Sequence, residues 1–375
     1  MLLAPVFTLF TSNITSSPPD FSHDEKQMSL KDALKAEADQ LGFVLFGVAP
    51  AIPPPHYPIY QAWIKAGRQA GMAYLARPEA VAARGAPEQL LPGCRSILCV
   101  ALPYPPPAPT SAESSDQTRG SIAAYAVLPD YHALMREKLN ALANRLPELV
   151  GKPVHTLVCV DTAPILEKDY AFMAGLGWIG RNSLLLTPQF GSYVFLGELL
   201  TDLKLEVDQP LEGDPCAQCR LCVQACPTQA LRPERSVDAR RCLSYWTIEH
   251  RGPVPEELRR SIGTRIFGCD NCQLACPLNA QGIPGGFTYA QEPVVDPFPD
   301  LLAEFALTQP EWQAKYGQTP VARAKYAGFR RNVAYALGNA GDPLALPALQ
   351  QACEQDPDPT VRDACAWALK QLQTN

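Results

Sequence analysis

The stretch CAQCRLCVQACP, from Cys216 to Pro227, decides how this chain is organised, because it spaces four cysteines as C-x2-C-x2-C-x3-C-P. This spacing is typical of proteins that hold two iron–sulfur clusters, in which the fourth cysteine of the run ligates the other cluster. The stretch CDNCQLACP, from Cys269 to Pro277, repeats the C-x2-C-x3-C-P end of the run. Two clusters need one thiolate more than these segments contain, and Cys242 lies between them to supply it.

The spacing therefore predicts two [4Fe–4S] clusters. Zinc also binds thiolates, but zinc ribbons are built from paired C-x2-C motifs and do not require a proline after the last cysteine. We therefore expect a protein that moves electrons. One cluster is assigned to Cys216, Cys219, Cys222 and Cys276, and the other to Cys226, Cys242, Cys269 and Cys272.

Composition places the chain among globular proteins. Its 375 residues are 47% hydrophobic and 19% charged, which suits about two or three domains with cores of their own. A formal net charge of −6 argues against a globally basic nucleic-acid-binding protein but allows a local basic patch. Clusters held by cysteines need a reducing compartment, so we expect a cytoplasmic protein. The apolar residues 1–10 are too short to span a bilayer, and no membrane association is expected.

The pattern of elements predicts an α+β fold with three domains. Residues 1–27 are expected to be a disordered or artefactual extension, with Met28 as a candidate start. Alternating apolar runs and helical patterns predict an α/β domain over 28–205, with strands at 43–48, 95–102 and 154–160. Residues 206–290 form a ferredoxin-like domain that contains the eight clustered cysteines.

The third predicted domain, residues 300–375, is helical. Two alanine-rich helices, Phe329–Leu346 and Val361–Leu372, flank Asp-Pro turns in a pattern typical of HEAT repeats. Only about one and a half repeats are present, so this domain must pack against the rest of the protein.

A basic segment precedes and overlaps the first of these helices. Residues 312–332 contain no acidic residue, and aromatic residues alternate with five basic ones. This composition suits a phosphate backbone with unstacked bases, but it also suits an ordinary solvated helix face. The basic residues are Lys315, Arg323, Lys325, Arg330 and Arg331.

Two motifs match known binding sites only in part. Residues 175–180, GLGWIG, match G-x-G-x-x-G, but the preceding residues 164–174 are expected to be helical, whereas a dinucleotide site follows a strand. We favour a tight turn that lines another flat ligand. Asp130-Tyr131-His132 resembles the start of the cobalt-binding D-x-H-x-x-G motif, but Met135 replaces its glycine. We favour a partly buried helical histidine.

From about residue 29 to its end, the chain resembles the epoxyqueuosine reductase family. The resemblance is carried by all eight cysteines and by four segments, which are VDTAP at 160–164, AGLGWIGRNSLLL at 174–186, GSYVFLGE at 191–198 and SYWTIEHRG at 244–252. It implies an enzyme with base-off cobalamin and two [4Fe–4S] clusters that reduces epoxyqueuosine to queuosine at the wobble position of tRNA, the last step of queuosine synthesis. Its implied partners are tRNA with a GUN anticodon and a low-potential electron donor. A monomer is expected.

The resemblance also implies functional residues. Asp161 is the expected proton donor, because an epoxide oxygen leaves as an alkoxide unless a general acid protonates it. Beside an apolar macrocycle, burial would raise the pKa of Asp161 and keep it protonated. Asp161 could equally cap a helix starting near Ala163. Cobalamin contacts are expected at Arg84, Asp161, Arg181, Asn182, Ser183, Ser192, Ser244, Tyr245 and Thr247, and tRNA contacts at Arg323, Lys325, Arg330 and Arg331.

The chain departs from the family pattern at residues 124–132. The usual R-Y-A-x-G-x-D-Y-H reads AYAVLPDYH here, so the arginine and the glycine are missing and no site is expected there. A reductive dehalogenase is the alternative enzyme, since that family also combines cobalamin with two clusters. Dehalogenases usually carry a twin-arginine signal and lack a HEAT-like tail, the reverse of this chain. A ferredoxin-type electron carrier and an RNA-binding module are the non-catalytic alternatives.

Overall fold

The computed structural model describes residues 29–107, 118–280 and 289–374. The expectations for residues 1–27 and for Met28 lie outside these ranges. Within the described helices, none has the length and hydrophobicity needed to cross a lipid bilayer.

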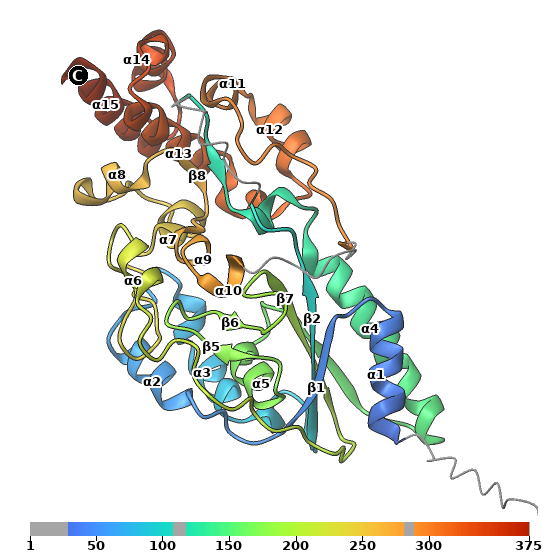
Figure 1. Cartoon of the computed structure of the whole chain (residues 1–375). Helices are drawn as coiled ribbons and strands as arrows, with labels where there is room; N and C mark the ends of the chain where they lie inside the picture. The colour runs from blue at the N-terminus through green and yellow to red at the C-terminus, as the bar shows by residue number, and fades with distance from the viewer. Residues whose placement is uncertain (1–28, 108–117, 281–288, 375) are drawn as a thin grey trace, which may run out of the picture.

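A four-stranded sheet forms the centre of the first half of the chain (Figure 1). Its order is β1 (Leu45–Pro50), β2 (Ser96–Pro103), β7 (Val194–Thr201) and β4 (Thr156–Cys159), and every pair is antiparallel. The three predicted strands are present, whereas β7, which occupies a central position, was not predicted. An antiparallel sheet with helices packed on its faces is an α+β arrangement.

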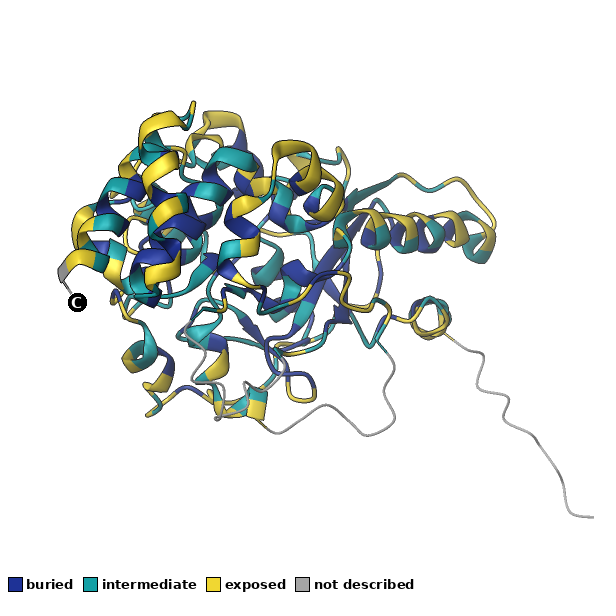
Figure 2. Cartoon of the chain, turned by 90° about the horizontal axis from the view of Figure 1, so that it is seen from above, coloured by how far each residue is buried: buried dark blue, intermediate teal, exposed yellow. Residues whose placement is uncertain are grey.

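Helices cover both faces of this sheet. Helices α1 (Leu30–Gln40) and α4 (Tyr131–Val150) pack on one face, and α5 (Glu167–Met173) packs on the other. Ser29 is the N-cap of α1, and its side chain accepts a hydrogen bond from the Asp32 amide. Because both faces are covered, β2 is buried along its whole length, and the buried residues concentrate in the middle of the molecule (Figure 2). Shorter elements around this core are α2 (Tyr57–Lys65), η1 (Ala73–Ala76), α3 (Pro78–Gly85), η2 (Pro87–Gln89), β3 (Ser121–Ile122) and η3 (Ala124–Val127).

The glycine run 175–180 follows a helix, as expected, and not a strand. It comes directly after α5 and leads into β5 (Trp178–Ile179), which pairs with β6 (Leu185–Leu186). A Cβ atom added at Gly177 would lie 2.3 Å from the carbonyl oxygen of Leu186, so only glycine allows this approach of two backbones.

The cysteine-containing region consists of short elements joined by turns. They are α6 (Leu221–Ala225), α7 (Leu243–Ile248), α8 (Glu256–Ile262), β8 (Arg265–Phe267), α9 (Asn271–Leu274) and α10 (Pro277–Ala280). Helix α6 lies within the first cysteine motif and α9 within the second, and these two short helices pack against each other.

The C-terminal region is helical. Its elements are α11 (Leu301–Ala306), α12 (Gln309–Tyr316), η4 (Pro320–Ala324), α13 (Lys325–Ala340), η5 (Pro343–Ala345), α14 (Leu346–Gln355) and α15 (Pro359–Thr374). The single helix expected over 329–346 is interrupted, because Gly341 adopts a left-handed φ of 78° that ends α13 before the Asp-Pro turn. Helix α15 packs against both α13 and α14.

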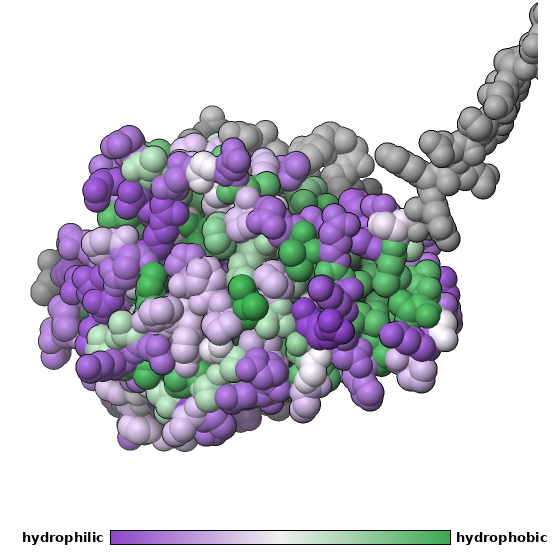
Figure 3. Space-filling model, turned by 90° about the horizontal axis from the view of Figure 1, so that it is seen from below, coloured by the Kyte–Doolittle hydropathy of each residue, from purple (hydrophilic) through white to green (hydrophobic). Residues whose placement is uncertain are grey.

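The hydrophobic core is continuous across the predicted domain boundaries. One core cluster runs from α1 and α4 through the cysteine-containing region to α13 and α15. Strand β3, from the first predicted domain, pairs in parallel with β8 of the second. The division at 28–205, 206–290 and 300–375 therefore stays a prediction. On the outside, hydrophobic residues are mixed with hydrophilic ones over the face shown in Figure 3.

Candidate active site

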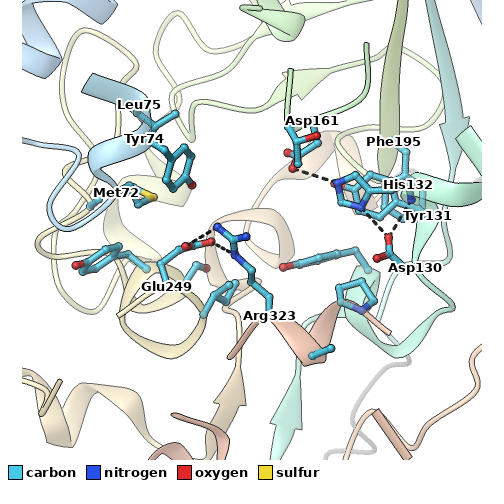
Figure 4. A pocket seen from close by; sticks show the side chains of 18 of the residues that line it. Met72, Tyr74, Leu75, Asp130, Tyr131, His132, Asp161, Phe195, Glu249 and Arg323 are labelled. Carbon is cyan, nitrogen blue, oxygen red and sulfur yellow. Dashed lines mark hydrogen bonds and ion pairs between the residues drawn. The ribbon is translucent and has the colours of Figure 1, made fainter. Parts of the chain in front are cut away.

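A cavity of about 1060 Å³ lies where the three regions of the chain meet. Ligand sites for small molecules typically measure about 300–1,000 Å³, so this one suits a large ligand. The sheet region contributes aromatic residues and Asp161, the cysteine-containing region contributes Cys242 and part of α7, and the C-terminal region contributes η4. The view in Figure 4 shows Asp161 and His132 facing Glu249 and Arg323 across the opening.

Stacked aromatic rings form one wall of the cavity. The ring centres of Tyr131 and Phe195 lie 4.1 Å apart, and the two rings are nearly parallel. The ring of Tyr104 also stacks on that of Phe195, with 4.6 Å between the ring centres. Phe195 projects from β7, and Tyr131 is the first residue of α4. A wall of flat apolar surfaces suits a flat apolar ligand.

Asp161 lies on the loop after β4, at the edge of this wall. Its backbone is left-handed, with φ of 48°, which costs free energy for any residue but glycine and is found most often at functional positions. The side chain is 52% exposed, so the protein itself does not bury Asp161 as we expected. Asp161 is also not a helix cap, because α5 begins at Glu167 with Leu166 as its N-cap.

His132 connects Asp161 to the beginning of α4. Its Nε2 lies 3.2 Å from Oδ2 of Asp161, and its Nδ1 lies 2.7 Å from Oδ1 of Asp130. Hydrogen bonds that His132 donates to the carboxylates of Asp130 and Asp161 raise its pKa to about 9, so the imidazole is a cation at neutral pH. The partial burial of His132 was predicted, but this contact was not, because nothing in the local sequence links two residues 29 positions apart.

The opposite rim of the cavity is basic. Arg323 donates two hydrogen bonds of 2.9 Å to the carboxylate of Glu249, and its guanidinium lies 5.8 Å from the ring centre of Tyr74. Lys325 is exposed beside it. Arg136 of α4, which was not predicted as a site residue, lines the cavity on the Asp161 side, where it donates to the Thr162 hydroxyl at 3.2 Å.

The other two basic residues of the predicted tRNA surface lie elsewhere. Arg331 is 1% exposed and donates to the backbone carbonyls of Trp246, His250 and Gly252. Arg330 is paired with Asp356. An arginine whose donors are saturated by the protein's own backbone holds elements together, so the structure does not place Arg331 on a surface that a partner can reach.

The expected cobalamin residues divide between several places. Arg84, Ser244 and Tyr245 line the large cavity together with Asp161. Arg84 is 7% exposed and lies over the ring of Tyr60 at 5.5 Å. Arg84 donates to the Ala80 carbonyl at 3.1 Å, and within the described ranges no carboxylate forms an ion pair with this residue of the cavity wall.

Five of the expected residues do not line the large cavity. Arg181 donates to the carbonyl of Cys216 at 3.0 Å, and with Asn182 it borders the cysteine loop. Ser192 accepts from Gln273 and lines a second, smaller cavity. The carbonyl of Ser183 accepts from Lys168, and Thr247 is 1% exposed and accepts from the Gly268 amide. None of these five residues lines the large cavity.

The four cysteines predicted for the first cluster lie together, and the assignment of ligands to each of the two clusters stays a prediction. Cys216, Cys219, Cys222 and Cys276 surround one small cavity, which Arg181 and Pro277 also line. Burial, followed by the other three thiols of this set, raises the pKa of Cys222. In the second set, burial and the thiols of Cys269 and Cys226 raise the pKa of Cys242. Because Cys242 also lines the large cavity, the second set lies next to the cavity and the first set lies farther away.

Three known families match successive parts of the chain. The family described as Epoxyqueuosine reductase QueG matches residues 84–162, a 4Fe-4S double cluster binding domain matches residues 215–279, and HEAT repeats match residues 321–375. The cluster-binding and HEAT assignments are thereby confirmed.

Curated relatives and solved structures extend this match to nearly the whole chain. The epoxyqueuosine reductase of Pseudomonas aeruginosa is 37% identical over 357 residues, which cover 94% of this chain and 96% of the relative. The epoxyqueuosine reductase of Escherichia coli is 36% identical, and the match covers 91% of this chain and 89% of the relative. The structure of epoxyqueuosine reductase from Streptococcus thermophilus superposes with a TM-score of 0.83 at 29% identity, covering 93% of this chain and 91% of that one. An epoxyqueuosine reductase solved with an epoxyqueuosine-modified tRNA-Tyr stem loop superposes with a TM-score of 0.82 at 32% identity. The match covers 92% of this chain and 90% of that one. The chain is an oxidoreductase and belongs to the epoxyqueuosine reductase family.

Proposed function

We propose that this protein reduces epoxyqueuosine to queuosine at the wobble position of tRNA with a GUN anticodon, using base-off cobalamin and two [4Fe–4S] clusters. The observation that carries the proposal is the convergence of three parts on one cavity, which are the Asp161–His132 pair, the Cys242 set and a basic rim. Each part corresponds to one need of the reaction, namely protons, electrons and a polyanionic substrate.

The cavity fits a cobalamin. It is large, one wall is made of stacked aromatic rings, and the buried Arg84 has no carboxylate partner in the described ranges and can donate to amide oxygens on the macrocycle's rim. Ser244 and Tyr245 line the cavity as well. When bound, cobalamin supplies a cobalt centre that passes electrons to the substrate.

No histidine is needed on the metal. Both ring nitrogens of His132 are engaged by carboxylates, Nδ1 by Asp130 and Nε2 by Asp161. A ligating histidine needs one free nitrogen, which His132 could offer only by breaking its contact with Asp161. This arrangement favours cobalamin held by its periphery.

Electrons would reach the cavity from the second cysteine set. Cys242 is at once a member of that set and a residue of the cavity wall, whereas the first set borders the outer loop 216–219. We infer that the first set would hold the cluster that receives electrons from an external low-potential donor, and that the second set would hold the cluster next to the cavity. Removing the epoxide oxygen as water then uses two electrons and two protons, breaks two C–O bonds and forms the C=C bond.

Asp161 is the proposed proton donor to the departing oxygen. Its loop position and its contact with the cationic His132 give it both access to the cavity and a neighbouring acid to restore its proton. The epoxyqueuosine reductase of Bacillus subtilis has been solved with its aspartate-containing catalytic loop swung out of the active site. A half-exposed aspartate on a left-handed loop residue fits such a role here.

The basic rim is the proposed tRNA contact. Arg323 and Lys325 come from the predicted basic segment, and Arg136 joins them from α4. Arg330 and Arg331 are left out of this proposal because their guanidinium groups are used inside the protein. Since the substrate is a tRNA, we propose that the protein works in the cytoplasm.

Anaerobic single turnover tests the proposal. Protein with reconstituted clusters is mixed with tRNA carrying epoxyqueuosine, with or without cobalamin, and the nucleoside is analysed by mass spectrometry. Loss of one oxygen only when cobalamin is present supports the reaction, the cofactor and the substrate together. No loss, despite bound cobalamin and reducible clusters, would contradict the proposal and would make halogenated substrates the next test.

A further inference from the structure

Two exposed leucines lie beside the first cysteine set. Leu221, the first residue of α6, is 47% exposed, and Leu274, the last residue of α9, is 60% exposed. Leu221 directly precedes Cys222 in the chain. Leu274 lies two residues before Cys276, and both of these cysteines line the small cavity of the first set. Because α6 and α9 pack against each other, the two leucines belong to one region of the surface.

An arginine without a partner accompanies these leucines. Arg220 is the sole charged residue of the segment 215–227, and it is exposed. Within the described ranges, no hydrogen bond or ion pair engages its guanidinium group. The nearest acid along the chain, Asp214, is paired with Arg235. The one acid of the second motif, Asp270, accepts a hydrogen bond from the Ala124 amide at 2.8 Å and so points towards η3.

This part of the surface is separate from the proposed substrate site. Neither Arg220 nor either leucine lines the large cavity, whose basic rim is the proposed tRNA contact. The second cysteine set borders that cavity through Cys242, whereas the first set lies farther out. Helix α6 lies at the outer edge of the molecule in Figure 1. Neither cobalamin nor tRNA therefore accounts for two exposed leucines and an unpaired arginine at this place.

We propose that Arg220, Leu221 and Leu274 form a docking patch for a small acidic protein that carries one low-potential electron near its surface. The inference rests on the proposed function, and it names the kind of electron donor and the surface that the donor uses. In each encounter the carrier gives up one electron to the cluster held by the first set. No bond is made or broken at the patch, and no proton moves there.

The size and the charge of the docking patch suit such a carrier. Reduction of one epoxide uses two electrons, so a one-electron carrier must bind and leave twice in each turnover. Complexes between redox proteins are accordingly small, often below about 1,200 Å² of buried surface. The leucines provide apolar area whose burial favours contact. An exposed unpaired cation increases the rate of encounter with a partner of opposite charge, which is why the expected carrier is acidic.

Stopped-flow reduction of the clusters tests the docking patch. The full chain with both clusters is mixed anaerobically with a reduced plant-type ferredoxin or a flavodoxin hydroquinone, which serve as acidic carriers. Reduced methyl viologen, a small molecule that needs no docking surface, is the comparison. Both carriers should reduce Arg220→Glu about 10-fold more slowly than the wild type at low salt, and this difference should shrink as salt screens the charge. Methyl viologen should reduce the variant no more slowly than the wild type.

Binding of the oxidised carriers provides a readout that does not depend on electron transfer. Combining Leu221→Ser with Leu274→Ser should weaken the affinity measured by calorimetry about 10-fold, also at high salt, because apolar contact is not screened. The matched controls are Leu344→Ser, at an exposed leucine of η5, and Arg260→Glu, at an exposed arginine of α8. Both controls should bind the carriers as the wild type does, and all variants should retain the wild-type iron content.

Two results would overturn the docking patch. One is that both carriers bind and reduce the patch variants as they do the wild type, and the other is that methyl viologen reduces the wild type while neither carrier does. If the double leucine variant loses iron, Arg220→Glu decides, because its side chain is exposed. Epoxide reduction is scored separately with methyl viologen as the reductant. Absence of oxygen loss there would overturn the proposed function, whereas the carrier-dependent rates, which need no tRNA, would still decide on the patch.

Discussion

The Nε2 atom of His132 lies 3.2 Å from the Oδ2 atom of Asp161, and this contact ties the first turn of α4 to the loop after β4. It joins a cation to the carboxylate that faces the cavity. The position of the Asp161 side chain is therefore held by a residue from a different element.

The stability contributed by His132 should depend on pH. Because Asp130 and Asp161 raise the pKa of His132 to about 9, its protonation stabilises the folded state fully below the unfolded value of about 6.5, and this contribution is lost as pH rises through about 9. The difference in denaturation midpoint between wild type and His132→Gln should be largest near pH 6 and should shrink towards pH 9. A difference that is constant over this range would show that His132 acts by packing alone.

Replacing two arginines of the basic segment 312–332, one at a time, should affect two different properties, the stability of the protein and its affinity for tRNA. Arg331→Ala leaves three buried backbone carbonyls without their donors and should lower the free energy of unfolding by about 2–5 kcal/mol, measured by denaturation. Arg323→Ala, at the exposed rim, should leave stability nearly unchanged. It should weaken tRNA binding and reduce the slope of log K against log salt by about 1. Equal effects of both variants on stability would contradict this distinction.

Cys242→Ala should remove one cluster and leave the other. The second set would keep three thiolates, so iron should fall from about eight to about four ions per chain, with the first cluster still visible by electron paramagnetic resonance after reduction. Cys353→Ala, outside both sets, is the matched control and should retain all the iron. Retention of both clusters in the Cys242 variant would show that another residue completes the second set.

The cluster ligands could be predicted from the sequence because cysteine spacing directly encodes how short loops deliver thiolates to one centre. Cys242 was found by counting the ligands that the two motifs lack, and its role as a ligand stays a prediction, supported by the effect of the Cys269 and Cys226 thiols on its pKa. The family segments that contain Asp161 and the glycine run could be recognised for the same reason, because each is a continuous stretch of sequence. The left-handed turn at Gly341, which divides the first C-terminal helix, was visible as Gly-Asp-Pro but was outweighed by the helical pattern around it.

Contacts between distant residues could not be predicted in this way. The basic run does not show that Arg331 faces inwards, because burial of an arginine depends on the carbonyls of another region. The sequence departure at residues 124–132 argued against a site there, yet His132 reaches the cavity. Glu198 was noticed only as part of a family segment, and its burial follows from the pairing of β7 with β2 and β4.

The most direct measurement compares wild type and Asp161→Asn in one anaerobic single-turnover experiment on tRNA carrying epoxyqueuosine. Both proteins should bind cobalamin and show the same cluster spectra, because Asn preserves the shape of the side chain. The wild type should convert the epoxide to the alkene, and the variant should be at least about 100-fold slower, since it lacks the general acid. Conversion by Asp161→Asn at the wild-type rate would contradict the assignment of Asp161 as proton donor and with it the proposed geometry of the site.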